Sequence, residues 1–598
     1  MTDSSPFHLK WKGKRGLLMK VLERMTGLRR LDRLYHQHIS NQRGKAFLES
    51  AMVALDFDYQ VHGAAFSSIP QEGSLLVVSN HPFGGAEGIA LLDVFLKARP
   101  DVRILSNQIL NALPGLKELF IGVDILSESS RQARKRANQA AIEEATQWVG
   151  NGGVLIIFPS GEVADWDWQS KATQEAPWRH TAGRILRETQ TSVMPVYVDG
   201  RNSWLFYLLG RIHPLLRTTR LVHELLNKKG QTLQLYGGSI APARTFNKLP
   251  QRNELTSALR MRSLLLDPKN QKVKTQEMAQ SSTCAVAPPV KAGLLANEIR
   301  QLPSNFRLLT KGDMEVWCSD AQSIPHLLQE IGRLRELTFR EVGEGTGQAV
   351  DIDDFDQHYL HLFLWNKEKQ EVAGAYRIGQ VDKLVAAKGV QGLYSRSLFH
   401  YDQRFLDKLG SCLEMGRSFI CPEYQKSLMA LQMLWKGIGC WVVQHPQYRV
   451  LFGPVSISND YQNLSRYLMA MSLKENNFDQ ELATLVQPVS PLPEMKGLPW
   501  NREMLAGLGD IEQLSSLVQL VEKDRGVPVL LKQYLKLNGT FVGFNVDSEF
   551  NDALDGLIIV DLLKSEKRAI SRYLGEAGYK VFCEYHAETS VSPASTVV

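Results

Sequence analysis

The sequence predicts a two-domain α/β protein, and three features of the chain support this fold class. In the first half of the 598 residues, short apolar runs alternate with helix-like segments, as in domains whose helices pack on a parallel sheet. Residues 268–292 are rich in Gln, Ser, Thr and Pro and lack periodicity, which indicates a linker. Beyond the linker the pattern becomes mixed α+β, with clustered acidic and aromatic residues.

The expected elements of the first domain follow from the spacing of its apolar residues. Four runs have the length and composition of buried strands: Ser74–Ser79, Val154–Phe158, Val193–Val198 and Thr232–Tyr236. Helices are expected over Ile89–Lys97 and Arg131–Val149, and in the second of these the small apolar residues share one helix face.

These patterns divide the chain into five expected segments. A basic amphipathic segment covers 1–45, a first α/β domain 46–267, the linker 268–292, a second domain 293–586 and a disordered tail 587–598. The tail is expected because chain ends fray unless they are tied down.

The composition excludes several classes of protein. Hydrophobic residues make up 44% and charged residues 22% of the chain, which excludes collagen-like, low-complexity and wholly disordered proteins. No window approaches the roughly 18 apolar residues of a membrane-spanning helix, which excludes a polytopic membrane protein. The six cysteines show no C-x-x-C spacing and no accompanying His cluster, so we expect neither a disulfide framework nor a metal site.

Positive charge is concentrated at the start of the chain. Residues 1–35 contain nine Lys and Arg against three acids, although the whole chain has a net charge of only +6. Apolar residues between Leu18 and Leu31 recur at spacings of three and four, which predicts an amphipathic helix. Such a helix either lies on an anionic membrane or packs on its own domain. Nucleic-acid binding is less favoured, because no recognition motif follows.

A first candidate site follows the strand Ser74–Ser79. His81 lies in the sequence Asn-His-Pro-Phe-Gly-Gly-Ala-Glu-Gly, and this turn can bring Glu87 back to the imidazole. The carboxylate would orient the ring while His81 takes a proton from an acceptor hydroxyl. The alternative is a structural His in a loop. A second strand end argues against that alternative, because Phe158, Pro159, Ser160, Gly161 and Glu162 form another turn that can position acceptor or thioester.

Together, the Asn-His-Pro sequence with its acid, Phe-Pro-Ser-Gly and Val-Met-Pro-Val resemble the glycerolipid acyltransferases over roughly 70–245. The resemblance implies that His81 is the base and that Glu87 orients it. The phosphate-binding arginine motif of that family has no clear counterpart near Phe120–Asp124. This departure argues against a glycerol-phosphate acceptor more than against acyl transfer, and the changes resemble the branch that acylates aminolipids.

A second candidate site follows the linker and combines acids with arginines. Four acids occur within 351–356, and Arg335, Arg377, Glu414 and Arg417 precede or follow them. Acids can hold ammonium groups and an Arg can bind a carboxylate through two hydrogen bonds, so the set suits an acceptor that carries both. The amine must also lose a proton before it attacks a thioester. Each feature taken alone has a simpler interpretation. The acid run would be a solvated loop, and Glu414 with Arg417 would be a surface ion pair.

This region resembles the acyl-homoserine-lactone synthases and the ornithine N-acyltransferases, which share the GCN5-related fold. The resemblance covers about 305–480, and its motif positions are Arg335, Phe339, Asp353, Asp356, Arg377, Glu414 and Arg417. It implies that Glu414 is catalytic and that the other six bind substrate.

The whole chain resembles the bifunctional ornithine lipid synthases. In that reading, the second domain N-acylates L-ornithine with a 3-hydroxyacyl thioester, and the first domain then O-acylates the free hydroxyl of lyso-ornithine lipid. The resemblance implies acyl carrier protein as donor partner, although coenzyme A is not excluded, and it implies no cofactor. A lipid product favours peripheral membrane contact through the basic helix, at the cytoplasmic face of the inner membrane.

Several alternatives stay open. The residues alone do not exclude glutamine, lysine or glycine as the amino acid. One other enzyme class fits, a lysophospholipid acyltransferase fused to a regulatory acyltransferase-like domain. A third interpretation is a membrane-bound scaffold that binds acyl carriers without turnover.

Overall fold

A computed structural model of the protein describes residues 26–108, 110, 113–124, 131–168, 172–249, 251–270, 284–426, 428–495, 497–523 and 525–591. The chain divides into two compact units. Unit 1 contains residues 1–272 together with 497–524, and unit 2 contains 273–496 together with 525–598. Most of the predicted basic helix, in residues 1–25, lies outside the described residues.

Unit 1 is built on a seven-stranded sheet with the order β1-β9-β8-β2-β5-β3-β4. Its strands are β1 (Phe57–His62), β2 (Leu75–Ser79), β3 (Val102–Asn107), β4 (Phe120–Val123), β5 (Val154–Ile157), β8 (Ser192–Asp199) and β9 (Gln231–Gly237). β8 and β9 are antiparallel, and all other neighbours are parallel. Parallel neighbours need long crossover connections, which here are mostly helical.

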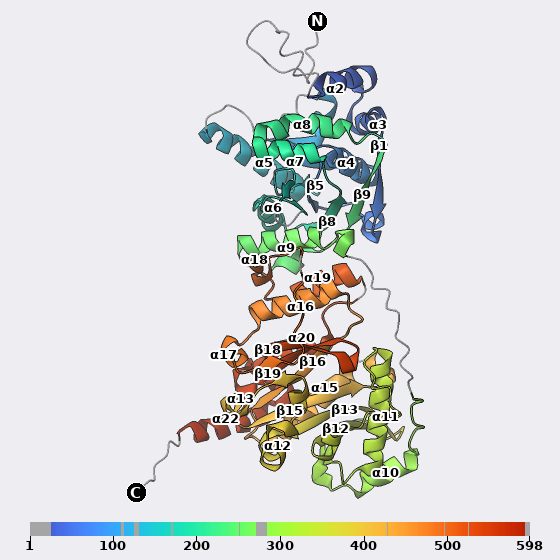
Figure 1. Ribbon diagram of the computed structural model, residues 1–598, viewed down its shortest axis with the longest axis vertical. Helices are drawn as coiled ribbons and strands as arrows, with labels where there is room; N and C mark the ends of the chain where they lie inside the picture. Colours follow the sequence, from blue (N-terminus) through green and yellow to red (C-terminus); the bar gives the residue numbers. More distant parts are fainter. Residues whose placement is uncertain are drawn as a thin grey trace. The chain divides into compact units, whose positions relative to one another are not determined.

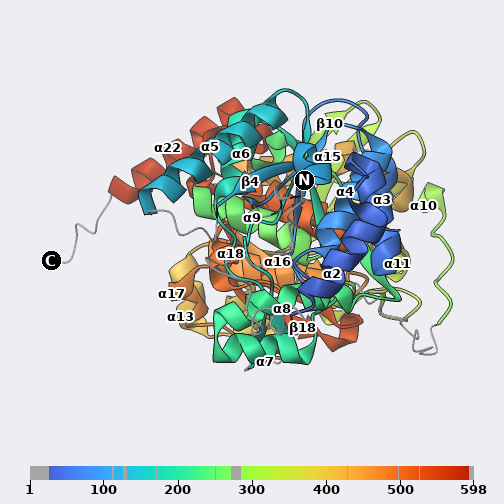
Figure 2. The ribbon, with the colours of Figure 1, turned by 90° about the horizontal axis from the view of Figure 1, so that it is seen from above.

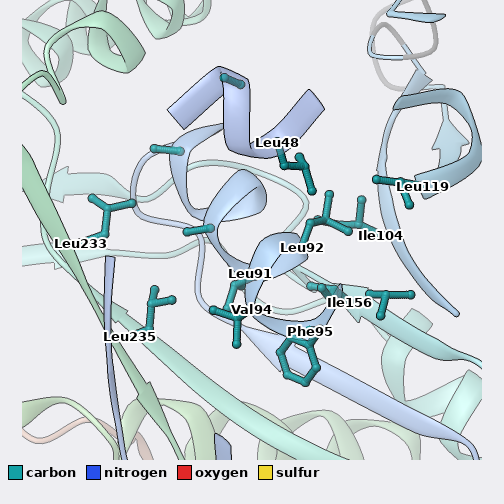
Figure 3. Packing of buried hydrophobic residues seen from close by; sticks show 14 of the residues in the cluster. Leu48, Leu91, Leu92, Val94, Phe95, Ile104, Leu119, Ile156, Leu233 and Leu235 are labelled. Carbon is teal, nitrogen blue, oxygen red and sulfur yellow. The ribbon is translucent and has the colours of Figure 1, made fainter. Parts of the chain in front are cut away.

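Helices cover both faces of this sheet (Figure 1). Successive side chains of β2 point to opposite faces, so Leu75 and Val77 join one apolar cluster while Leu76 and Val78 join another. The first cluster is completed by α3 (Gly44–Leu55) and α4 (Ala86–Ala98). Figure 3 shows its centre, where the α4 side chains meet the strands.

The second cluster is completed by α5 (Arg131–Gly150), α6 (Thr181–Thr189) and α9 (Arg252–Leu264). Two helices from late in the sequence pack on α9, namely α18 (Arg502–Ala506) and α19 (Ile511–Glu522). Unit 1 therefore includes a segment from late in the sequence, residues 497–524, that no feature of the sequence pattern had indicated.

The predicted elements of the first domain are confirmed to within a few residues at their ends. Each of the four predicted strands and both predicted helices has a counterpart. Strands β1, β3 and β4 were not predicted. In β1 only Phe57 is buried, and in β4 only Ile121 is buried while Gly122 interrupts its apolar residues, so neither gives a continuous buried apolar run.

Unit 2 is built on an eight-stranded mixed sheet with the order β10-β11-β12-β13-β15-β16-β19-β18. Its strands are β10 (Arg307–Lys311), β11 (Met314–Asp320), β12 (Leu360–Asn366), β13 (Glu371–Gln380), β15 (Cys412–Ile420), β16 (Val450–Ile457), β18 (Thr540–Asp547) and β19 (Ala553–Asp561). Helices α10 (Ala292–Gln301) and α11 (Pro325–Glu341) contribute to an apolar cluster with strands β11–β13 and β15. The predicted two-domain α/β fold class is therefore confirmed.

The parallel pair β15 and β16 separates partway along its length. The two strands pair only through Cys412–Glu414 and Val450–Phe452, although β15 continues to Ile420 and β16 to Ile457. Past that point β15 stays paired with β13, and β16 with β19. The facing edges therefore present backbone N–H and C=O groups that do not pair with each other, and such edges can bind an extended, amide-containing ligand.

Two further observations concern the chain ends and the membrane. Helix α22 (Glu576–Val591) continues past the predicted start of the tail at residue 587, and residues 592–598 lie outside the described residues. Among the helices that the structure describes, none combines the length and the apolar character needed to cross a membrane.

Candidate active sites

His81 and Glu87 lie at the carboxyl end of the central strand β2. The strand ends at Ser79, and Glu87 is in the first turn of α4. His81 Nδ1 lies 2.9 Å from Glu87 Oε1, at ion-pair distance, although the two groups are not aligned for a good hydrogen bond. Such pairs often align only when substrate binds. The structure thus brings together the two residues that the sequence paired.

Glu87 is held in place and in its charged form by its surroundings. Its side chain is buried, and Oε1 also accepts hydrogen bonds from the backbone N–H groups of Phe83 and Gly84, both at 2.9 Å. Burial alone would raise the pKa of Glu87, but His81 and these two N–H groups lower the pKa further than burial raises it. The carboxylate is therefore suited to stabilise an imidazolium on His81.

In the second predicted turn, residues 158–162, Phe158 contacts the His81 side chain. The ring of Phe158 stacks on the imidazole, with centroids 4.3 Å apart and planes 21° from parallel. Ser160 is buried, and its hydroxyl donates to the carbonyl of Glu162 at 2.9 Å. The Glu162 side chain is about half exposed and pairs with Arg179 and Arg217 at 3.7 and 3.8 Å. Pro159 and Gly161 complete the turn, so acceptor binding by Ser160 or Glu162 stays a prediction.

Two residues that support the His81 loop were not predicted. Asn80 bonds β8 twice, because its side chain accepts from Val198 N at 2.7 Å and donates to Val198 O at 2.9 Å. Glu175 accepts the backbone N–H of His81 at 2.6 Å. Asn80 could have been singled out from its place beside His81, whereas no sequence signal marks Glu175.

In unit 2, the predicted acids and arginines form a buried charge network with one another. Arg335 makes two hydrogen bonds to the Asp356 carboxylate, at 2.8 and 3.1 Å. Arg377 Nη1 donates to Asp353 Oδ1 at 2.6 Å and lies 3.4 Å from Asp356 Oδ1. Arg335, Arg377 and Asp356 are almost completely buried. Phe339, the remaining predicted residue of α11, instead packs against the apolar cluster of α10 and α11, so substrate binding by these five stays a prediction.

Arg417 differs from the other two arginines of this network. Its ion pairs with Asp353 and Asp351 are long, at 3.6 and 3.8 Å, and its buried Nε has no hydrogen-bond partner among the residues that the structure describes. The residue has φ +48°, and the β13–β15 register shifts between Ala375 and Arg377, which is the signature of a β-bulge. A non-glycine residue in this conformation is strained, and such strain often accompanies function. The bulge therefore sets the direction of the Arg417 side chain, whose guanidinium is buried and only weakly paired.

Glu414 is fully engaged by donors from three residues. Its carboxylate accepts the backbone N–H groups of Tyr394 and Ser395 at 3.1 and 2.7 Å, and the hydroxyls of Tyr359 and Ser395 as well. Because both oxygens are occupied, the side chain fixes the segment around Tyr394 and Ser395. A catalytic role for Glu414 stays a prediction.

Three other acids gather near Arg417 and were not predicted. Asp555 on β19 is paired with Asn545 on β18, so Asp555, Asn545 and Asp547 face the same side of the sheet. Burial and the repulsion of neighbouring acids raise the pKa of Asp555 and that of Glu344 to about 7. Arg417 interacts electrostatically with Asp547 and Asp555. We call Glu344, Asp547 and Asp555 the acid cluster. Its members come from two segments about 200 positions apart, the chain after α11 and the β18–β19 hairpin, so no linear motif could reveal it.

Two family models match separate parts of the chain. Residues 24–229 match a family model described as acyltransferase. Residues 334–436 match a model described as acetyltransferase (GNAT) domain. The first match contains His81, Glu87 and Phe158, and the second contains the charge network and Glu414.

Curated relatives correspond to two different acyl-transfer activities. A glycine N(alpha)-acyltransferase of Bacteroides thetaiotaomicron is 31% identical over 300 residues, which cover 47% of this chain and 87% of that protein. A glycine N(alpha)-acyltransferase of Phocaeicola vulgatus is 29% identical over 300 residues, 47% of this chain and 90% of that protein. A lyso-glycine lipid O-acyltransferase of P. vulgatus is 30% identical over 215 residues, 35% of this chain and 73% of that protein.

Proposed function

Because the chain belongs to the families of the glycine N(alpha)-acyltransferases and the lyso-glycine lipid O-acyltransferases, we propose that it makes an ornithine lipid in two steps. The chain is a bifunctional acyltransferase, with N-acyl transfer to an amino acid and O-acyl transfer to a lyso-lipid. The choice of ornithine, the 3-hydroxyacyl donor and the acyl carrier protein are the proposed parts.

The two proposed steps form a sequence in which the first product is the second acceptor. In unit 2 the amine attacks the thioester carbonyl, the amide bond forms, and the carrier thiol leaves. In unit 1 His81 takes the proton of the 3-hydroxyl as that oxygen attacks a second thioester carbonyl, and Glu87 stabilises the resulting imidazolium. The ester bond forms as the C–S bond breaks, and the imidazolium returns its proton to the leaving thiolate. The amine step must come first, because it supplies the acyl chain that carries the hydroxyl.

The acid cluster is the observation that supports a diamino acid. Ornithine carries two ammonium groups and one carboxylate, whereas glycine carries one of each. Arg417 offers a weakly paired guanidinium for the carboxylate. Of the three carboxylates of Glu344, Asp547 and Asp555, nearby Arg466 offsets one, which leaves two for the two ammonium groups. A pKa near 7 lets Glu344 or Asp555 accept a proton from the attacking amine. Glycine is the second candidate, because the curated relatives are named for it.

The amino acid can be tested by replacing Asp547. We expect the purified chain, supplied with a 3-hydroxyacyl carrier protein, to acylate ornithine in preference to glycine. The change Asp547→Asn should lower kcat/KM for ornithine about tenfold or more, because one charge-assisted contact is lost, and should leave kcat/KM for glycine unchanged. The products are measured by mass spectrometry, with lysine as a third acceptor.

The matched control for Asp547 is Glu566→Gln. Glu566 lies in the same unit beyond the β18–β19 hairpin, and its side chain is exposed, so neither acceptor should be affected. Equal losses for ornithine and glycine with Asp547→Asn would remove the support for a diamino acid. Acylation of glycine alone by the unchanged protein would replace ornithine with glycine as the acceptor.

The acid cluster also predicts how ornithine binding depends on pH. Burial and mutual repulsion raise the pKa of Glu344 and Asp555 to about 7 in the free protein, so both are largely protonated at pH 6 and largely ionised at pH 8. Ionised carboxylates bind ammonium more tightly, so KM for ornithine should fall as pH rises from 6 to 8. Initial rates across this range test this, and a KM that is constant or rises would contradict a cationic ligand at the cluster.

A further inference from the structure

A cavity of about 480 Å³ lies in unit 1, between the chain after β8 and the region where α8 (Pro214–Leu226) ends. Its wall includes Trp166, Arg201, Asn202, Trp204 and Lys228. Cavities of this size hold small molecules or the polar part of a larger one. No step described so far uses this cavity.

The wall of the cavity is built directly on the loop that carries His81. The Asn202 side chain donates to the carbonyls of Pro82 and Phe83, both at 3.2 Å. The ammonium of Lys228 lies 3.8 Å from the centroid of the Phe83 ring. Because Pro82 and Phe83 follow His81 in the chain, two residues of the cavity wall contact the loop that carries the proposed base.

The wall carries positive charge that is only partly compensated. Lys228 is 4% exposed, and its ammonium donates one long hydrogen bond, 3.4 Å, to the carbonyl of Arg201. Burial lowers the pKa of Lys228, and nearby Glu224 and Glu87 oppose this without cancelling it. The Glu224 carboxylate, however, already accepts the backbone N–H and the hydroxyl of Ser203, at 2.8 and 2.5 Å. A buried ammonium in this setting is stabilised by an anionic ligand.

The cavity also contains a polar atom without a partner. Asn202 is 3% exposed, and its Oδ1 atom is buried with no hydrogen-bond partner in the described part of the chain. Buried polar atoms are nearly always bonded, so an orphaned one next to a cavity points to a missing ligand or water. This atom could accept a hydrogen bond from an N–H group, such as the amide of an N-acyl amino acid.

One exposed apolar side chain lies at the edge of the cavity, and two more lie at the other end of the same helix pair. Trp204 lines the cavity yet is 64% exposed, and it begins α7 (Trp204–Ile212). Helices α7 and α8 lie side by side (Figure 2), and Ile212 and Leu216 are 67% and 42% exposed where one helix leads into the other. Cations inside and exposed apolar side chains outside fit an amphiphile with an acidic head and a hydrocarbon chain.

We propose that this cavity binds the free carboxylate of the N-acyl amino acid that is O-acylated at His81. The inference rests on the proposed function and assigns its second acceptor a headgroup site. Lys228 within the cavity and Arg201 at its exposed mouth hold the carboxylate, and Asn202 faces the amide. A phosphate head would meet the same cations, so lysophosphatidic acid is included in the test.

The test compares an acid headgroup with its neutral analogue. The full-length chain is given an acyl donor and either N-(3-hydroxyacyl)ornithine, its carboxamide, or lysophosphatidic acid. We expect Arg201→Gln to raise KM for the acid about tenfold, because one charge-assisted contact is lost, with kcat within about twofold, and to leave KM for the carboxamide unchanged. Lys228→Met should act in the same direction, and Lys228→Arg should restore part of the affinity.

The control is Arg211→Gln, which removes an exposed cation of α7 that does not line the cavity. Thermal unfolding of each variant separates lost binding from lost folding, and Arg201 is exposed, so its replacement should leave the unfolding midpoint unchanged. Equal KM changes for acid and carboxamide, or none for either, would overturn the headgroup site while leaving the proposed function intact. Conversion of lysophosphatidic acid but of no N-acyl amino acid would instead refute the proposed function.

Discussion

Replacing His81 with alanine is expected to stop the O-acyl transfer and leave the N-acyl transfer intact. The imidazole is the only proposed proton acceptor for the hydroxyl, and a positioned base contributes about 10²- to 10⁴-fold to the rate. Glu87 is a poor substitute, because its side chain is completely buried and its lowered pKa makes its carboxylate a weak base. Cells that express His81→Ala should therefore accumulate the mono-acyl hydroxy-amide, which mass spectrometry of extracted lipids detects.

The control for this variant is His62→Ala, which removes an imidazole from the edge strand β1 of the same sheet. Both acylations should continue in that variant. The pure His81→Ala protein should still N-acylate the amino acid at the rate of the unchanged chain. If His81→Ala abolished both products, the two active sites would not be independent and the two-step scheme would fail.

The His81 site could be predicted because its chemistry is local in the sequence. His81 and Glu87 are six positions apart, and a strand end followed by a Gly-rich turn is enough to bring them together. The residues that complete the site are distant in sequence. Glu175 bonds the His81 backbone from 94 positions away, and Asn202 bonds the same loop from about 120 positions away, so only the sheet order reveals them.

In unit 2 the sequence identified the charged residues but not their partners. Arg335, Asp353, Asp356 and Arg377 are present in the predicted order, yet they bond mainly to one another. Which acid meets which arginine depends on the pairing of β12 with β13 and on the turn at 353–356, and neither follows from charge alone. The acid cluster depends on the β18–β19 register, which lies beyond the motif region.

Asp356→Asn is expected to have the largest effect on unit 2, lowering its free energy of unfolding by about 3–5 kcal/mol. The change removes the carboxylate that Arg335 binds through two hydrogen bonds and that Arg377 approaches at 3.4 Å. Both guanidiniums are 1% exposed, so each would lose a partner without gaining water. N-acyl transfer should be lost at urea concentrations at which the unchanged chain still N-acylates, while O-acyl transfer follows the unchanged curve.

The matched control is Asp354→Asn, two positions away in the same turn, where the carboxylate is exposed and the stability change should stay within about 0.5 kcal/mol.

Acid titration gives an independent check of the Asp356 network. Burial raises the pKa of Asp356, but Arg335 and Arg377 lower it by more. A carboxyl whose folded pKa is depressed contributes stability that is fully present above its unfolded pKa, about 3.9, and that is lost as pH falls through the folded value. Unit 2 of the unchanged chain should therefore lose stability below about pH 4, and Asp356→Asn should lose less over the same range. If Asp356→Asn and the unchanged chain unfolded alike, the network would not stabilise the fold, and its arginines would become stronger candidates for substrate binding.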